Sequence, residues 1–483
     1  MSLRFLFFTN IHKLFLNFQK STNDRPLSKR LTQKIISIFK LHKIEFINTK
    51  KNFIKLKKLN FKKSGLNLNL VSKKIDISLL AAFKLYSKFI CIYFIYLISI
   101  INSLFALKKK YSSYNFIYFG KKRLRINDFK EVIIKIKKNF KLQNNSLYII
   151  DYNYNLNYSN NIYFSKRPVV QFFKICLNNK KKIQFFLKFI KLFFIFNFRI
   201  IQNKSLLLVG QDLIENEIYN YTNKNYKINI YCNISKLTDT PYWFKKENYN
   251  IKTYFIWDSI EPFLSLIFNK KDLKIQSMWI PYLCVDQHCF EEEIFKKFYK
   301  RISLFIPKKK IRLLKSEKIK YIKTLKNNNK AKLIIFDVNP EPGIYFDNLK
   351  NYEIYANINN IKKFILDIVN IVNKINLKHS KNIEVVLKRK KMTINSELKK
   401  EYYNFLKEKK IKIINNFNHK KINFSLAIIY PMTSIPHIYP EIIKKLFLYY
   451  DPTSEIYIDK KFTGVDFSKS KKNLENRILK IAK

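Results

Sequence analysis

The chain has 483 residues, of which 47% are hydrophobic, enough to bury the cores of two or three domains and to exclude a disordered tail. The formal net charge of +60 is typical of proteins that bind nucleic acid or an anionic membrane. However, most of the basic residues are lysines, whereas proteins that read bases and phosphates favour arginine, and the excess of Lys, Asn, Ile, Phe and Tyr with only 5 glycines is typical of an AT-rich genome. We therefore interpret the charge as a solvated lysine surface and expect no nucleic-acid partner.

Residues 1–110 are predicted to form a basic helical region with a membrane-associated segment. Residues 89–107 carry no charge and are bounded by lysines on both sides. Their length is just enough for a helix that crosses a bilayer, and a half-inserted helix or a buried core helix fits equally well. A second apolar stretch, 185–200, has three basic residues among its aromatics, which is typical of a helix lying on an anionic membrane surface.

Residues 111–306 are predicted to form a first α/β domain. Short apolar runs ending in polar residues alternate here with helical periodicities, as in an open sheet whose ligands gather beyond the carboxyl ends of its strands. The expected strands are 147–151, 205–209, 228–231 and 253–257. A basic link, 307–332, is expected to be helical and to separate this domain from the next.

Residues 333–483 are predicted to form a second α/β domain with the clearer pattern. The expected strands are 333–338, 383–387, 411–414, 425–430 and 446–450, and the expected helices are 361–375, 396–407 and 440–445. With right-handed crossovers, this alternation predicts a doubly wound, largely parallel sheet.

Polar residues follow three strands of this second sheet. The three clusters are Lys388 with Arg389, Pro431 with Thr433 and Ser434, and Tyr450 with Asp451. Because the carboxyl ends of parallel strands meet at one edge, we expect the clusters to converge there. Cations, hydroxyls and a helix N-terminus suit a diphosphate, and a carboxylate suits a sugar hydroxyl. The alternative for Thr433 and Ser434 is that they only cap a helix.

The cysteines and histidines predict no metal site. Cys284, His288 and Cys289 lie close together, but two further ligands at a suitable spacing are missing from the sequence around them. No Asp-x-Asp pair follows a predicted strand. We interpret the cysteines as buried thiols in a reducing cytoplasm and expect neither a metal nor a cofactor.

The C-terminal motifs resemble those of the bacterial polysaccharide-biosynthesis proteins named for a Pro-Phe-Thr-Ser motif. That motif stands here as residues 431–434, with Met432 in place of Phe, and the family's later Tyr-Tyr-Asp-Pro is intact at 449–452. Further similarity lies in 254–262, 278–290 and 386–391: Trp257 and Ser259 occupy motif positions, Asp258 replaces the family's usual Tyr, and Trp279 is shifted by one residue from its motif position.

The resemblance implies a glycosyltransferase of the B type, with two Rossmann-like domains facing a cleft. Such an enzyme would transfer a sugar, without a metal, from a nucleotide sugar to a glycan or lipid-linked acceptor in bacterial surface polysaccharide or lipopolysaccharide biosynthesis, at the cytoplasmic face of the cell membrane. Asp258 is the candidate for the base that removes the acceptor proton, and a helix-capping role is its alternative. The competing hypotheses are a membrane-associated scaffold without catalysis and a basic nucleic-acid-binding protein.

Overall fold

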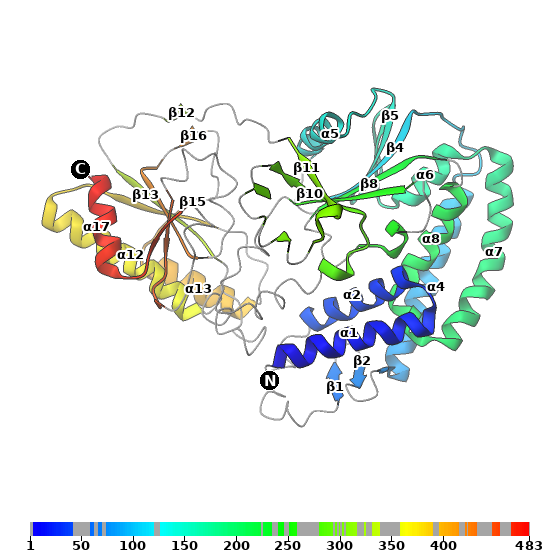
Figure 1. The fold of residues 1–483 in the computed structure, drawn as a ribbon, viewed down its shortest axis with the longest axis horizontal. Helices are drawn as coiled ribbons and strands as arrows, with labels where there is room; N and C mark the ends of the chain where they lie inside the picture. The colour runs from blue at the N-terminus through cyan, green and yellow to red at the C-terminus, as the bar shows by residue number, and fades with distance from the viewer. Residues whose placement is uncertain are drawn as a thin grey trace.

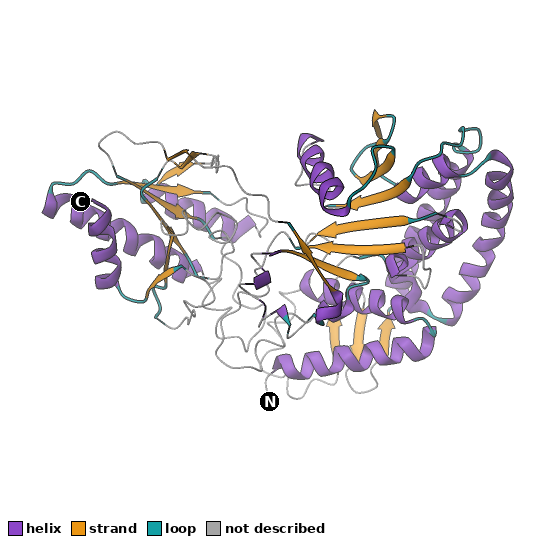
Figure 2. Ribbon diagram, turned by 45° about the horizontal axis from the view of Figure 1, so that its top comes forward, coloured by secondary structure: helices purple, strands orange, loops and turns teal. Residues whose placement is uncertain are grey.

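Two units, each built around its own mainly parallel sheet, make up most of the described chain (Figure 1). The computed structural model describes residues 3–41, 58–61, 66–69, 74–119, 126–223, 226–233, 240–245, 251–257, 280–292, 295–296, 299, 302–303, 306–315, 323–324, 331–338, 358–389, 396–414, 421–422, 424–431, 447–454 and 465–482. Helices flank the strands of both sheets (Figure 2), so the fold belongs to the α/β class.

The first sheet has the strand order β11-β10-β9-β8-β4-β5-β7-β6. Its strands are β4 (Ser113–Tyr118), β5 (Ser146–Asp151), β6 (Leu156–Ser159), β7 (Ile162–Ser165), β8 (Ile228–Asn233), β9 (Ile251–Ile256), β10 (Gln287–Glu291) and β11 (Ile311–Leu314). All of these pair in parallel except β6, which runs antiparallel to β7 at the edge. The first strand of this sheet in chain order, β4, lies near its centre. Later strands are added on both sides of it, as in a doubly wound sheet.

Helices cover both faces of the first sheet. They are α5 (Ile126–Phe140), α6 (Pro168–Cys176), α7 (Asn179–Gln202) and α8 (Gly210–Thr222). Because successive strand residues point to opposite faces, Ile117 packs with Phe129 of α5, whereas Phe116 belongs to the core formed with α6 and α8. The apolar run 205–209, predicted as a strand, is instead the 3₁₀ helix η2 (Lys204–Val209), in which Leu206 and Leu207 are buried in the core that the helices form.

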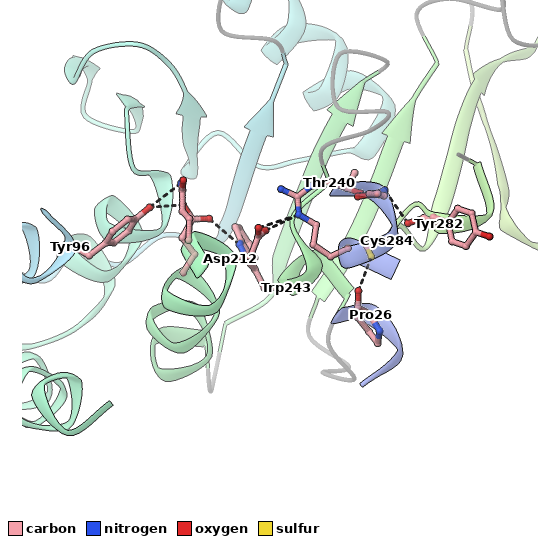
Figure 3. Close-up of polar contacts among 11 residues, drawn as sticks. Pro26, Tyr96, Asp212, Thr240, Trp243, Tyr282 and Cys284 are labelled. Atoms are coloured by element: carbon pink, nitrogen blue, oxygen red, sulfur yellow. Dashed lines mark hydrogen bonds and ion pairs between the residues drawn. The ribbon is translucent and has the colours of Figure 1, made fainter. Parts of the chain in front are cut away.

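The N-terminal helices belong to the same core. They are α1 (Leu3–Thr22), α2 (Arg25–Leu41) and α4 (Leu79–Ile101). Between α2 and α4 in the sequence, the chain forms a small antiparallel sheet of β1 (Lys58–Phe61), β2 (Leu66–Asn69) and β3 (Lys74–Ile77). Gln33 of α2 donates from Nε2 to the Tyr282 carbonyl at 3.0 Å and to Thr240 Oγ1 at 2.8 Å (Figure 3). Leu31 and Phe116 share one apolar cluster. The boundary predicted at residue 110 therefore divides a single packed unit.

The uncharged segment 89–107 is not one helix. α4 ends at Ile101, and Ser103 closes its last turn by donating to the carbonyl of Ser99 at 2.7 Å. The whole of α4 has 23 residues and is the one helix among the described residues that is long and apolar enough to cross a membrane, and only 22% of its most apolar window is buried. One face, with Phe89, Tyr93 and Tyr96, packs against the rest of the unit.

The second sheet has the strand order β15-β14-β13-β17-β18-β19, and every pair is parallel. Its strands are β13 (Lys332–Phe336), β14 (Glu384–Lys388), β15 (Lys412–Ile414), β17 (Leu426–Ile429), β18 (Phe447–Tyr450) and β19 (Asp466–Ser468). Counted from β13 along the chain this is the order 3-2-1-4-5-6, which is the order of a Rossmann sheet. The prediction of two doubly wound α/β units is confirmed.

The helices of the second unit are α12 (Ile358–His379), α13 (Ser396–Glu408) and α17 (Lys471–Ala482). The apolar face predicted for 361–375 is buried along α12, and the predicted helix 440–445 lies outside the described residues. The predicted helical link 307–332 instead begins with a 3₁₀ turn (Lys308–Lys310) and β11, because 311–314 completes the first sheet beside β10. A two-residue strand in it, β12 (Lys323–Thr324), pairs with β16 (Lys421–Ile422).

A buried aromatic and imidazole pair lies where the end of β9 meets the first half of β10. The Trp257 indole donates from Nε1 to His288 Nδ1 at 3.2 Å, and both side chains are buried. Burial lowers the pKa of His288 to about 3, and the positive charges of Lys310 and Lys29 add to the effect. The imidazole is therefore neutral near neutral pH, as an acceptor for the indole must be.

We expect Gly210→Ala to destabilise the protein. A Cβ at residue 210 would lie 2.7 Å from Cδ2 of Phe89, which is itself buried, so the first turn of α8 or the ring must move. Overpacking of this kind costs about 1–3 kcal/mol. Urea denaturation should show this loss, and Gly210→Ala combined with Phe89→Leu should lose less than the sum of the two single changes. A Gly210→Ala protein as stable as the wild type would contradict the predicted clash.

We expect His288 to make stability depend on pH below about 6.5. As the pH falls from there toward 3, the unfolded chain takes up a proton that the folded state excludes, so the free energy of unfolding decreases, by about 2 kcal/mol at pH 5. In urea titrations, His288→Gln should lose less stability between pH 7 and pH 5 than the wild type. The same change at the exposed His379 should leave the wild-type slope; equal slopes in all three proteins would refute the assignment.

Candidate functional site

The second sheet has its topological switch point between β13 and β17. From these neighbours the chain winds outward in opposite directions, and doubly wound sheets bind ligands in the crevice beyond the carboxyl ends at such a point. β13 is followed there by Asp337, and β17 by Tyr430 and Pro431. The Pro431 motif therefore starts at the switch point, while Thr433 and Ser434 lie outside the described residues.

Lys388 and Asp337 stand side by side on this edge. Lys388 is paired in register with Phe336, and the Asp337 N–H donates to the Lys388 carbonyl at 3.0 Å. Partial burial lowers the pKa of the Lys388 ammonium, and the nearby Asp337 carboxylate opposes that shift. Asp337 is buried and accepts a hydrogen bond from the Tyr402 hydroxyl at 2.5 Å. The edge thus carries a half-buried cation beside a fixed carboxylate.

The predicted residues on this edge are spread across several strands. Lys388, Phe336, Ile429 and Tyr449 follow one another in register. Three strand spacings therefore separate Lys388 from the strand that leads to Asp451, which amounts to about 14 Å. A single phosphate group cannot contact both residues, so only an elongated ligand would reach from one to the other.

Three of the predicted ligand contacts have other partners. The Tyr450 hydroxyl donates to Asp367 of α12 at 2.7 Å, so this side chain points into the core and not toward a ligand. Asp451 is fully buried and accepts from Thr453 through the backbone N–H at 2.9 Å and the hydroxyl at 2.6 Å, which orders the turn after β18. The Arg389 guanidinium stacks on the Tyr403 ring of α13 with its centre 4.4 Å from the ring centroid. We therefore withdraw Tyr450 as a ligand contact.

In the first unit, the predicted motif residues fall mainly outside the described chain. Asp258, Ser259 and Trp279 are among the residues that the structure does not describe. Trp257 is described, and its indole is buried between Phe255 and Phe290 with its N–H on His288. This contact gives Trp257 a structural role in the core of the first unit.

A cavity of about 380 Å³, here called the first-sheet pocket, opens at the carboxyl edge of the first sheet. Tyr118, Asp151 and Lys166 line it from the ends of β4, β5 and β7, and the first turn of α8 lies beside them. Helices α2 and α4 complete its wall. It is the counterpart in the first unit of the edge that carries the predicted site in the second.

A buried polar network forms one wall of this pocket (Figure 3). Arg30 Nε of α2 lies 3.1 Å from both carboxylate oxygens of Asp212 in α8. Glu215, one turn further along α8, accepts from the Tyr96 hydroxyl at 2.5 Å and from Trp243 Nε1 at 3.1 Å. Burial raises the pKa of Glu215, although these hydrogen bonds oppose the shift. The wall therefore combines a buried ion pair with a buried acid whose pKa is raised by desolvation.

The sequence did not identify Asp337 or the residues of the first-sheet pocket. Asp337 had a signal, since it is an acid directly after a buried strand, as is Asp151. The basic residues of the pocket had none, because they come from separate elements and are not marked out among 94 basic residues. Within the described ranges, no three His, Cys, Asp or Glu side chains come together as a metal site.

Several solved structures have a similar overall fold. They include OtsA in its apo form (10% identity, TM-score 0.40, 77% of this chain and 91% of that chain), the Methanocaldococcus jannaschii UDP-GlcNAc 2-epimerase (12%, 0.34, 77% and 92%) and the lipopolysaccharide outer core galactosyltransferase WaaB (10%, 0.36, 77% and 90%). At these identities the likeness concerns the fold alone. No curated protein matches the chain in sequence.

The resemblance noted in the C-terminal motifs extends over more than half of the chain. The family described as polysaccharide biosynthesis PFTS motif protein matches residues 190–478, a stretch that begins within α7, includes the switch point of the second sheet and ends within α17. The chain therefore belongs to the polysaccharide biosynthesis PFTS motif protein family.

Proposed function

We propose that the protein is a glycosyltransferase that moves a sugar from a nucleotide sugar to an acceptor in bacterial surface polysaccharide or lipopolysaccharide biosynthesis. The observation that carries this proposal is the place of the family motif: Pro431 begins it at the switch point of a Rossmann-ordered sheet. Membership of a polysaccharide-biosynthesis family supports the substrate class. The second unit would bind the donor, and the first would bind the acceptor across a cleft.

The second-sheet edge offers groups for a departing nucleoside diphosphate. Lys388 supplies a half-buried cation, and the motif that starts at Pro431 would add the Thr433 and Ser434 hydroxyls and backbone N–H groups. Such donors act on charge that develops on the leaving phosphate, which is how they would lower the barrier without a metal.

The proton of the attacking acceptor hydroxyl needs a base from the first unit. Asp258 is the candidate that the family motif indicates. Asp151 is a second candidate, because it ends β5 and lines the first-sheet pocket. In either case the carboxylate would accept the hydroxyl proton as the bond from the sugar to the diphosphate breaks.

We further propose that the protein works in the cytoplasm, attached to the inner face of the cell membrane through α4 and α7. These helices pack side by side, with Tyr93 stacked on Phe189 at 4.6 Å between ring centroids. An exposed apolar stripe runs along the outer side of α7: Ile183, Leu187, Ile190, Phe194, Phe198 and Ile201. The flanking lysines suit anionic lipids. One face of α4 packs on α7 and α8, so lipid cannot surround this helix on all sides. We therefore favour attachment at the membrane interface over a helix that spans the bilayer.

The donor site can be tested by nucleotide binding to the purified full-length protein. We expect one nucleoside diphosphate or its sugar to bind, with Thr433→Ala/Ser434→Ala and Lys388→Met each weakening its affinity about tenfold, because each removes a phosphate contact. Ser425→Ala is the matched control, since Ser425 lies at the opposite end of β17 and bonds the Lys332 N–H. If no nucleotide or nucleotide sugar binds, or if the Ser425 variant loses as much affinity, the donor site is wrong.

Membrane attachment can be tested by sedimentation with vesicles that contain phosphatidylglycerol. Leu187→Glu/Phe194→Glu places two charges on side chains that are 62% and 69% exposed, so it should reduce the bound fraction several-fold without unfolding the protein. Leu377→Glu, at an exposed leucine of α12 in the second unit, should bind like the wild type. Equal binding by the α7 variant and the wild type would contradict the proposed attachment surface.

A further inference from the structure

The first-sheet pocket has chemistry that the proposed donor site does not use. We propose that it binds the phosphate or diphosphate group of a lipid-linked acceptor, whose hydrocarbon chain leaves along α4 toward the apolar surface of α4 and α7. This proposal rests on the proposed glycosyltransferase function in one respect: that function is what makes the bound lipid an acceptor. The binding itself follows from the charges, the cavity and the apolar surface described next.

Lysines from three separate elements converge on the pocket. Lys34 comes from α2, Lys88 from α4 and Lys166 from the end of β7. Within the described chain, neither Lys88 nor Lys166 has a carboxylate partner in an ion pair. The two ammonium groups are therefore not neutralised by that part of the protein. Cations arranged around a cavity of about 380 Å³ provide a site for a multiply charged anion.

The N-terminus of α8 adds backbone donors to these cations. Gly210, Gln211 and Asp212 line the pocket, and Val209, which precedes them, provides no side-chain cap. The first N–H groups of a helix have no partner within the helix, and its dipole favours a negative charge there. With 13 residues, α8 is long enough for this effect, and it acts on the same space as the lysines.

The acids of the pocket do not cancel this positive charge. The Asp212 carboxylate is balanced by Arg30, with both side chains buried. Glu215 is buried and accepts hydrogen bonds from Tyr96, Gln211 and Trp243, so its carboxyl group is already engaged within the wall. Asp151 then remains against Lys34, Lys88 and Lys166. Even with all three acids ionised, the four basic residues that line the pocket outnumber them, so the balance of charge favours an anion.

The pocket borders an apolar surface, which distinguishes a lipid-linked phosphate from a soluble one. Leu85, Phe89 and Ile92 of α4 line the pocket together with Lys88. Two helical turns after Lys88, on the same side of α4, Ile95 is 42% exposed, and the exposed apolar side chains of α4 and α7 continue from there. A soluble phosphate compound would gain nothing from that surface, whereas a hydrocarbon chain would be buried along it.

The test is binding of farnesyl diphosphate to the full-length protein by isothermal titration, with inorganic diphosphate and farnesol as the two halves of the probe. We expect farnesyl diphosphate to bind at least about tenfold more tightly than either half. Lys88→Ala/Lys166→Ala should weaken it about tenfold. Lys84→Ala is the matched control, because Lys84 is an exposed lysine one turn before Lys88 that does not line the pocket; it should change the affinity less than about twofold.

Two results would overturn the proposal. If inorganic diphosphate binds as tightly as farnesyl diphosphate, the ligand is a soluble phosphate, and if Lys84→Ala weakens binding as much as the pocket variant, the attraction is unspecific. Nucleotide binding measured on the same samples separates the two hypotheses. Farnesyl diphosphate that fails to bind while a nucleotide binds rejects the acceptor site alone; the reverse result rejects the donor site and leaves the lipid-phosphate pocket standing.

Discussion

Parallel strand pairing is the constraint on which both candidate sites depend. When neighbouring strands run in one direction, each connection must cross back over a face of the sheet, and every strand delivers its carboxyl end to the same edge. In the first sheet this brings together Tyr118, Asp151 and Lys166, and in the second it aligns Asp337 with Lys388. Residues that are remote in the chain thus become neighbours because of topology, without any local motif.

The buried ion pair between Arg30 and Asp212 holds helix α2 in its place in the first unit. Such a pair contributes little net stability, since desolvation offsets much of the attraction, but removing one partner leaves a buried charge that is costly. Here it fixes α2 to the first turn of α8, and Gln33 fixes the same helix to Thr240 and Tyr282. Helix α2 lies in the region whose composition predicts a separate basic segment, but these contacts make it a structural wall of the cavity.

The sequence predicted the strands that are buried on both faces, because their apolar runs are short and end in polar residues; β5, β8, β13, β14 and β17 are examples. It failed at 205–209, since an apolar run buried by helices has the same composition as one buried by strands. In the site, Lys388 and Pro431 were recognisable from their position after strands. Tyr450 was misassigned because burial on a strand face, not its place at the strand end, decides its partner. The lysines of the pocket carry no local pattern.

The contacts of α2 also set an order for the synthesis of the protein. Gln33 and its partner Tyr282 are 249 residues apart in sequence. A ribosome that adds roughly 5–20 residues per second needs about 10–50 s to make that stretch. During this interval α2 lacks the partners that hold it, and the apolar side chains of α4 leave the ribosome before α7 and α8 exist to cover them. The nascent chain thus exposes the apolar side chains of α4 early in synthesis. Chaperones or a lipid surface are then the first partners that can cover them.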